Sequence, residues 1–176
     1  AYNVVENCLF SNIMAGFGLS IVCADSPHNI GQNMVRNNVF RDAPHILPNG
    51  AEAIVLYTEG LQKNNPLHSI VEGNVFDNWN GDEETVSVKS AMNIIRNNVF
   101  TNISRGSVSL RRETGNIVES NYFANVDIGV WVFGANHVIR NNIFLNTKRE
   151  AVRLSGGGNL TAGDPVFETA KNNLIA

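Results

Sequence analysis

Two basic residues, Lys89 and Arg111, stand 22 residues apart at the same place in two similar short segments. Each ends a stretch in which apolar and polar residues alternate, VSVK (86–89) in one case and VSLR (108–111) in the other. Successive side chains of a β-strand point to opposite faces, so both cations are expected to point away from the apolar residues. If they are stacked on neighbouring strands with no acid between them, they repel each other unless an anion or a function compensates. A functional site is one interpretation, and a plain surface pair is the other.

Acidic and amide residues come shortly before these cations along the chain. Glu84 lies five positions before Lys89, and Asp82 lies two positions before Glu84. Glu52 precedes a similar alternating segment, and Asn49 begins the same approach. Several hard oxygen ligands beside a basic pair are typical of a calcium site more than of a zinc site, and the four histidines show no ligand spacing. As exposed carboxylates at a turn, the same acids would need no metal.

An internal repeat must position these residues. A seven-residue pattern that ends in phenylalanine occurs six times and contains many of the 27 asparagines. Its copies are VVENCLF (4–10), MVRNNVF (34–40), IVEGNVF (70–76), IIRNNVF (94–100), IVESNYF (117–123) and VIRNNIF (138–144). A second series consists of the alternating apolar pairs Ile54/Leu56, Val86/Val88, Val108/Leu110, Val130/Val132 and Val152/Leu154. These pairs follow at 22 residues after a first interval of 32, which is one period plus an inserted loop.

The period and the alternation together predict the fold. A helical solenoid needs ten or more residues with a 3.6-residue period in each repeat, and no such window exists. A period near 22 with two short strands per repeat, separated by Asn and Gly, is typical of a right-handed parallel β-helix. We therefore expect an all-β solenoid of about seven coils, forming a single domain over residues 1–176.

Stacked coils place equivalent residues in columns. The residues four positions before each phenylalanine alternate in charge along the chain: Glu6, Arg36, Glu72, Arg96, Glu119 and Arg140. Opposed unlike charges on neighbouring strands contribute about 0.2–1 kcal/mol each, and they also specify the register. The phenylalanines are expected to stack in the core. The residues two positions before them, mostly asparagine, are expected to form an interior amide ladder at a bend, where asparagine tolerates left-handed backbone angles.

The composition excludes several classes of protein. With 43% hydrophobic and 16% charged residues the chain is too apolar for a disordered protein, and a formal net charge of −3 argues against a nucleic-acid partner. No apolar run approaches the ~20 residues of a membrane span. We therefore expect no nucleic acid and no membrane as partners. Cys8 and Cys23 either form a disulfide or stay as free thiols.

Residues 81–116 (GDEETVSVKSAMNIIRNNVFTNISRGSVSLRRETGN), followed by HVIRNNIF (137–144), resemble the polysaccharide lyase family that contains chondroitinase B and many alginate lyases. In that family an acid-x-acid pair precedes a lysine-serine dipeptide, and an arginine motif follows one coil later. Asp82 and Glu84 match the acidic pair.

The same resemblance assigns a catalytic pair. Lys89 and Ser90 match the lysine-serine dipeptide, Arg111 matches the arginine, and Asn49 in NGAEAI matches an asparagine that is the third calcium ligand of the family. What this implies is β-elimination on a uronic-acid polysaccharide, with alginate favoured over chondroitin or dermatan sulfate. Lys89 would remove the C5 proton, Arg111 would assist the charge and the leaving group, and calcium would neutralise the C5 carboxylate. The resemblance also implies a secreted or periplasmic protein.

Further residues are candidates for binding the sugar chain. Arg112 extends the basic patch, and Trp131 and Tyr57 offer aromatic rings on the same expected face. Where the family has histidine and glycine after the arginine, this chain has Arg112 and Glu113. The rival hypothesis is therefore a non-catalytic β-helix that binds glycan or serves as a structural or assembly module. Because the chain begins inside a coil, it is expected to be a fragment or a shortened solenoid, and self-association through the solenoid ends is a second expectation.

Overall fold

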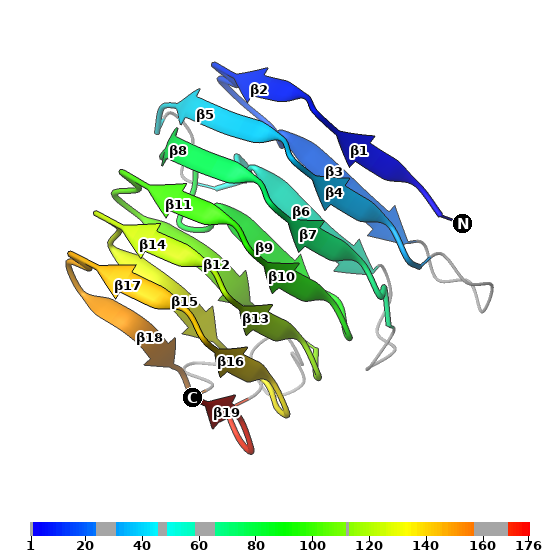
Figure 1. Ribbon diagram of the computed structural model, residues 1–176, viewed down its shortest axis with the longest axis vertical. Helices are drawn as coiled ribbons and strands as arrows, with labels where there is room; N and C mark the ends of the chain where they lie inside the picture. The colour runs from blue at the N-terminus through cyan, green and yellow to red at the C-terminus, as the bar shows by residue number, and fades with distance from the viewer. Residues whose placement is uncertain (1, 24–30, 46–48, 59–65, 112, 157–168) are drawn as a thin grey trace.

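The computed structural model describes residues 2–23, 31–45, 49–58, 66–111, 113–156 and 169–176. Within these ranges the chain forms short β-strands that pair in parallel in three sheets, and it forms no helix. Figure 1 shows the strands stacked in chain order, one coil upon the next, from the N-terminal to the C-terminal end. The predicted all-β, right-handed parallel β-helix is confirmed.

Each sheet receives one strand from each of the first six coils, and β19 adds a seventh strand to one sheet. Sheet A contains β1 (Val4–Glu6), β4 (Met34–Arg36), β7 (Ile70–Glu72), β10 (Ile94–Arg96), β13 (Ile117–Glu119), β16 (Val138–Arg140) and β19 (Leu174–Ile175). Sheet B contains β2 (Leu9–Ser11), β5 (Val39–Ala43), β8 (Val75–Trp79), β11 (Val99–Thr101), β14 (Tyr122–Ala124) and β17 (Ile143–Leu145). Sheet C contains β3 (Leu19–Cys23), β6 (Ile54–Thr58), β9 (Val86–Lys89), β12 (Gly106–Leu110), β15 (Ile128–Val132) and β18 (Glu150–Leu154).

The coil has three strands, where the sequence predicts two. Each seven-residue motif bends in its middle, so that its first half lies in sheet A and its second half in sheet B. The bend falls on the residue three positions before each phenylalanine, whose φ is 55–64°. These residues are Asn7, Asn37, Gly73, Asn97, Ser120 and Asn141. Asparagine and glycine tolerate this left-handed region. The sequence placed the left-handed backbone at the laddered asparagine, but the structure places it at the residue just before.

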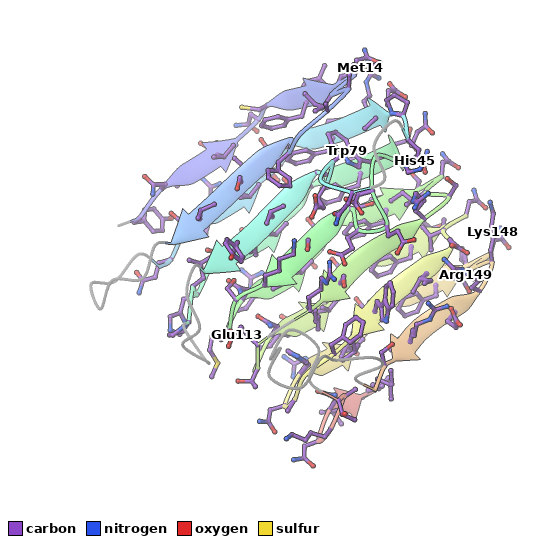
Figure 2. The ribbon with its side chains drawn as sticks, turned by 180° about the vertical axis from the view of Figure 1, so that it is seen from behind. Met14, His45, Trp79, Glu113, Lys148 and Arg149 are labelled. Carbon is purple, nitrogen blue, oxygen red and sulfur yellow. The ribbon has the colours of Figure 1, made fainter. Side chains whose placement is uncertain are left out.

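The phenylalanine column is a continuous stack inside the solenoid. Ring centroids of successive members of Phe10, Phe40, Phe76, Phe100, Phe123 and Phe144 lie 4.5–5.0 Å apart with nearly parallel planes. The inward residues of sheet C belong to the same core, including Val86, Val88, Val108 and Leu110. In Figure 2, which shows the side chains from behind, Trp79 lies among these strands. Its indole Nε1 donates to the carbonyl of Ala51 at 2.9 Å, so the core also anchors the loop before β6.

The alternating charges of sheet A form three ion pairs between consecutive coils. Arg36 contacts Glu6 at 2.6 Å, Arg96 contacts Glu72 at 2.7 Å and Arg140 contacts Glu119 at 2.7 Å. The register of the strands sets each arginine beside the glutamate of the preceding coil. This column is the partly exposed structural face that the sequence predicts.

The interior amide ladder follows the column Asn38, Asn74, Asn98, Asn121 and Asn142. At Asn98 the side-chain oxygen accepts from the backbone N–H and the amide of Asn74, while its own amide donates to Val71 and to Asn121. Each amide thus bonds to the coils on both sides, as expected. Because the first four of these asparagines are buried, the ladder satisfies backbone polar atoms that would otherwise lack partners.

A second interior ladder was not predicted. Asn93 bonds through its backbone N–H and its amide to the side-chain oxygen of Asn116, and the backbone N–H of Asn116 bonds to Nδ1 of His137 at 3.1 Å. Nε2 of His137 lies 2.9 Å from the carbonyl of Phe133. An amide oxygen has two lone pairs and can accept two hydrogen bonds, whereas Nδ1 of His137 has one, which the backbone N–H of Asn116 uses. The side-chain amide nitrogen of Asn116 is therefore buried without a partner.

Large exposed apolar residues gather at the two ends of the solenoid. They include Tyr2, Val4, Leu9, Met14 and Phe17 in the first coil and Ile143, Leu145, Leu154, Leu174 and Ile175 in the last strands. Self-association through these ends stays a prediction. Cys8 is an exposed free thiol, and the side chain of Cys23 lies outside the described residues. The described ranges contain no helix long and apolar enough to cross a membrane.

Candidate active site

The two cations lie next to each other on the outer face of sheet C. In the register of β9 and β12, Val88 pairs with Leu110, and the backbone N–H of Arg111 bonds to the carbonyl of Val88 at 2.9 Å. Arg111 therefore follows directly beside Lys89 on the next coil. The valines of β9 are fully buried, which confirms that the basic side chains occupy the opposite face.

Each cation contacts a buried glutamate. Nζ of Lys89 lies 3.3 Å from Oε1 of Glu52, and Nη1 of Arg111 lies 3.0 Å from Oε1 of Glu84. The acids that the sequence places beside the basic pair therefore contact the two cations. Each acid stands two residues before its strand begins, and its side chain reaches one coil along sheet C to the cation of the following coil. Both glutamate side chains are at most 6% exposed, so these contacts form in a largely desolvated environment.

The carboxyl of Glu84 has a perturbed affinity for protons. Burial raises its pKa above the ordinary value, and the nearby charge of Glu52 acts in the same direction, whereas Arg111 and Ser87 oppose the shift. Ser87 donates its hydroxyl to Oε2 of Glu84. Desolvation thus outweighs ion pairing at Glu84.

The other predicted calcium ligands occupy the loops beside these glutamates. Asp82 is 5% exposed, and its oxygens accept from the backbone N–H groups of Gly50, Ala51 and Glu83. It therefore ties the loop before β9 to the loop before β6. Asn49 is exposed and lies next to Gly50 in the tied loop. The roles of both residues as calcium ligands stay predictions.

The two glutamates offer carboxylate oxygens, which are the type of ligand that calcium prefers. Oε2 of Glu52 is buried and has no hydrogen-bond partner, which is rare for a carboxylate oxygen. Calcium prefers six to eight hard oxygen ligands and completes its shell with water or substrate oxygens. In the part of the chain that the structure describes, no three His, Cys, Asp or Glu side chains gather as a metal site. The unpartnered oxygen of Glu52 is compatible with a cation ligand, and the calcium site stays a prediction.

The predicted sugar-binding residues lie at different places. Tyr57 pairs in register with Lys89, so its ring is part of the same row across sheet C. Trp131 pairs with Ser109 one coil beyond Arg111, as expected for an outward residue. Its Nε1 donates to the hydroxyl of Ser155 at 2.6 Å. Arg112 lies outside the described residues.

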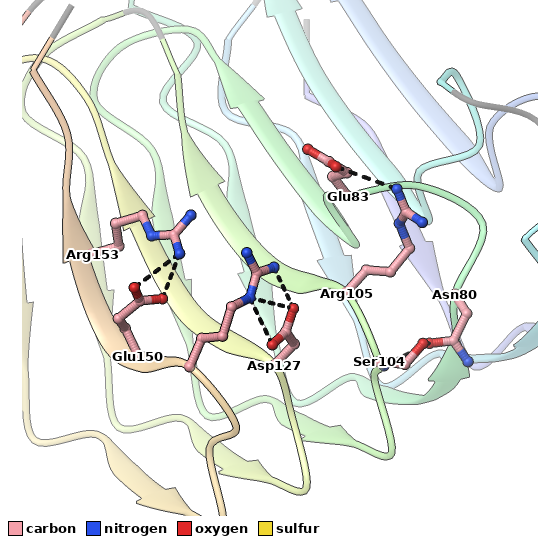
Figure 3. Close-up of polar contacts among 8 residues, drawn as sticks. Asn80, Glu83, Ser104, Arg105, Asp127, Glu150 and Arg153 are labelled. Carbon is pink, nitrogen blue, oxygen red and sulfur yellow. Dashed lines mark hydrogen bonds and ion pairs between the residues drawn. The ribbon is translucent and has the colours of Figure 1, made fainter. Parts of the chain in front are cut away.

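A second group of charged residues, which was not predicted from the sequence, lies at the start of the sheet C strands. Figure 3 shows three acid–arginine pairs along this edge: Glu83–Arg105, Asp127–Arg149 and Glu150–Arg153. The first two pairs have the 22-residue spacing of the repeat, which could have found them. The third pair lies within one strand, where spacing between coils carries no signal.

The chain matches the chondroitinase B family over residues 1–168. The chain belongs to the chondroitinase B family. No match is found among curated proteins.

Two solved structures are similar to this member of the chondroitinase B family. A mannuronic acid specific polysaccharide family 6 lyase from human gut microbiota shares 24% identity with a TM-score of 0.80, over 98% of this chain and 41% of the lyase. The alginate lyase AlyF-OU02, solved as a complex with G6, shares 15% identity with a TM-score of 0.48, over 99% of this chain and 64% of the other. This chain thus spans less than half the length of the first lyase.

Proposed function

We propose that this chain carries the catalytic residues of a polysaccharide lyase that cleaves a uronic-acid polymer by β-elimination. The supporting observation is the adjacency of Lys89 and Arg111 on sheet C, each in contact with a buried carboxylate. Membership of the chondroitinase B family supports the same class of reaction.

Lys89 is the proposed base. Its amine takes the C5 proton of the uronate, the electron pair forms the C4=C5 double bond, and the bond from C4 to the glycosidic oxygen breaks. Negative charge develops on the uronate carboxylate as the proton leaves, and Arg111 beside Lys89 stabilises that charge. The leaving oxygen takes a proton, for which Arg111 or water is the nearest proposed source. A positioned base contributes roughly 10²–10⁴-fold to such a step.

Glu52 and Glu84 have two proposed roles. They hold Lys89 and Arg111 in place at 3.3 and 3.0 Å, and they bind calcium. Calcium, when bound, would neutralise the substrate carboxylate and so acidify the C5 proton. Asp82 and Asn49 are the further ligands that we propose from the loops beside them.

The proposed substrate is alginate in preference to chondroitin or dermatan sulfate. The similar lyase is described as mannuronic acid specific, which supports a mannuronate polymer as the first substrate to test. Action on such a polymer is consistent with the secreted or periplasmic location that we propose.

The test is an ultraviolet assay for the C4=C5 double bond with polymannuronate, mixed alginate and dermatan sulfate, in calcium and in chelator. We expect product from polymannuronate, and a loss of about 10²-fold or more in Lys89→Ala. Lys171→Ala, which removes an exposed lysine outside the site, is the matched control. Binding of polymer without product by the wild type would instead establish the non-catalytic glycan-binding module.

A further inference from the structure

A groove separate from Lys89 opens at the start of the sheet C strands. We call it the arginine groove; it has a volume of about 190 Å³ and is lined chiefly by Glu83, Arg105, Asp127, Trp131, Arg149 and Arg153. Typical sites for drug-sized ligands measure roughly 300–1,000 Å³, so this groove suits one sugar ring or one charged group. Its charged lining consists of three arginines and two carboxylates, and Glu150 pairs with Arg153, so each guanidinium has an acidic partner.

The arginines are held in fixed orientations by acids. Arg149 bonds to Asp127 of the preceding coil through Nε and Nη2, and Arg153 bonds to both oxygens of Glu150 through Nη2. The guanidinium of Arg153 also lies over the Trp131 ring, 5.1 Å from its centroid. Such contacts reduce the conformational entropy that the side chains would lose on binding a ligand.

Donors remain unused after these contacts are made. A guanidinium has five N–H groups in a planar fork, and Arg153 uses only Nη2 toward Glu150. Arg105 contacts Glu83 at 3.3 Å through Nη2, while its Nε is buried and has no partner. A buried donor without an acceptor is unfavourable, so a small movement of Arg105 that brings Nε to an oxygen of a bound anion would favour binding.

We propose that the arginine groove is an anion subsite that binds the carboxylate of an acidic sugar residue through Arg105, Arg149 and Arg153. Planar guanidinium groups bind carboxylates in paired hydrogen bonds, whereas a neutral sugar offers no group that matches several arginines. Trp131 supplies an aromatic edge for the apolar face of the same ring. The inference rests on the proposed function, because it concerns the same class of polymer.

The groove lies further along the solenoid axis than Lys89. The residues Ser87, Ser109, Trp131 and Arg153 stack in one column across sheet C. Parallel strands are about 4.8 Å apart, so Arg153 lies about 14 Å along the solenoid axis from the coil of Lys89. The subsite therefore holds a unit of the polymer beyond the one that reacts.

Calorimetric titration with mannuronate oligosaccharides tests the subsite. All proteins carry Lys89→Ala, so that no substrate is consumed. The test variant is Arg149→Gln with Arg153→Gln. The control is Arg36→Gln with Arg140→Gln, which makes the same charge change in arginines that pair with glutamates on sheet A. We expect Kd to rise about tenfold or more in the test variant and less than about twofold in the control.

Neutral mannan oligosaccharides of the same length are the second probe, and their Kd is expected to be the same in both variants. Equal Kd values for mannuronate in the test variant and the control would overturn the proposal. Arg153→Lys keeps the charge without the planar fork; if the double variant fails to fold, an unchanged Kd in this single variant would overturn the proposal as well. The double-bond assay on the wild type is independent: product without groove-dependent binding refutes the subsite alone, and groove-dependent binding without product refutes the lyase alone.

Discussion

Arg111 and Glu84 pair across adjacent coils of sheet C, with 3.0 Å between Nη1 and Oε1, although 27 residues separate them in the sequence. The same sheet brings Glu52 to Lys89 across 37 residues. In both pairs the acid is buried and the cation partly exposed, so the basic groups lie between the buried acids and the outer surface. Each acid thus links the buried interior to a basic side chain at the outer surface of sheet C.

Replacing Glu84 by glutamine is expected to lower kcat/KM about 10–100-fold, because Arg111 loses its charged partner and calcium loses a ligand. Stability should change little, since burial already disfavours the charged form of this carboxyl and raises its pKa. Glu119→Gln removes the equivalent partner of Arg140 on sheet A and is expected to leave turnover unchanged. Steady-state kinetics and thermal melts of both variants make the comparison; equal kcat/KM in the two variants would contradict the role given to Glu84.

Acid is expected to destabilise the protein through His137. Burial lowers the pKa of this imidazole below its ordinary value of 6.5, and its Nδ1 accepts a hydrogen bond from the Asn116 N–H. The unfolded chain therefore binds a proton below about pH 6.5 that the folded chain does not, so stability is full above that pH and falls as the pH decreases.

His137→Asn places in this ladder the residue type that the neighbouring coils already carry, and it should flatten the decline in Tm between pH 8 and pH 5. His68→Asn, at an exposed histidine, should keep the wild-type slope. Parallel Tm curves for wild type and His137→Asn would rule out this linkage.

The middle of the phenylalanine stack is expected to contribute more than its end. Phe100 is fully buried between Phe76 and Phe123, so Phe100→Ala should lower the free energy of unfolding by about 3–5 kcal/mol. Among the described residues Phe144 stacks on Phe123 alone, and it is partly buried, so Phe144→Ala should cost less. Urea unfolding of both variants measures the difference, and equal losses would show that the stack does not act through burial.

The interior amide ladder is expected to be sensitive to removal of one member. Asn98→Ala removes the acceptor of the Asn74 N–H and a donor to the Val71 carbonyl, both buried. Leaving such groups unpaired costs about 1–3 kcal/mol each, so the free energy of unfolding should fall by at least about 2 kcal/mol. Asn102→Gly removes an exposed asparagine whose φ is 56° without straining the backbone, and it should cost less. A loss in Asn98→Ala no larger than in this control would contradict the ladder.

The spacing of residues along the sequence was sufficient to predict the parts of the structure that repeat. A period near 22 predicted the parallel coils, and the columns of phenylalanine, asparagine and alternating charge lie where the period puts them. The number of strands per coil was wrong because a left-handed residue such as Asn97 divides one apolar motif between two sheets. Backbone angles at a bend depend on a single residue, and periodicity does not report them.

The sequence by itself therefore determined the solenoid, its register and the adjacency of Lys89 and Arg111, because residues one period apart must meet in stacked strands. Only the tertiary structure decided which acids contact these cations, how Asp82 ties two loops together and where the arginine groove opens. Those contacts arise from side chains that cross from one coil to the next at loops of unequal length. Their partners follow from the path of the chain in space, and the repeat does not specify that path.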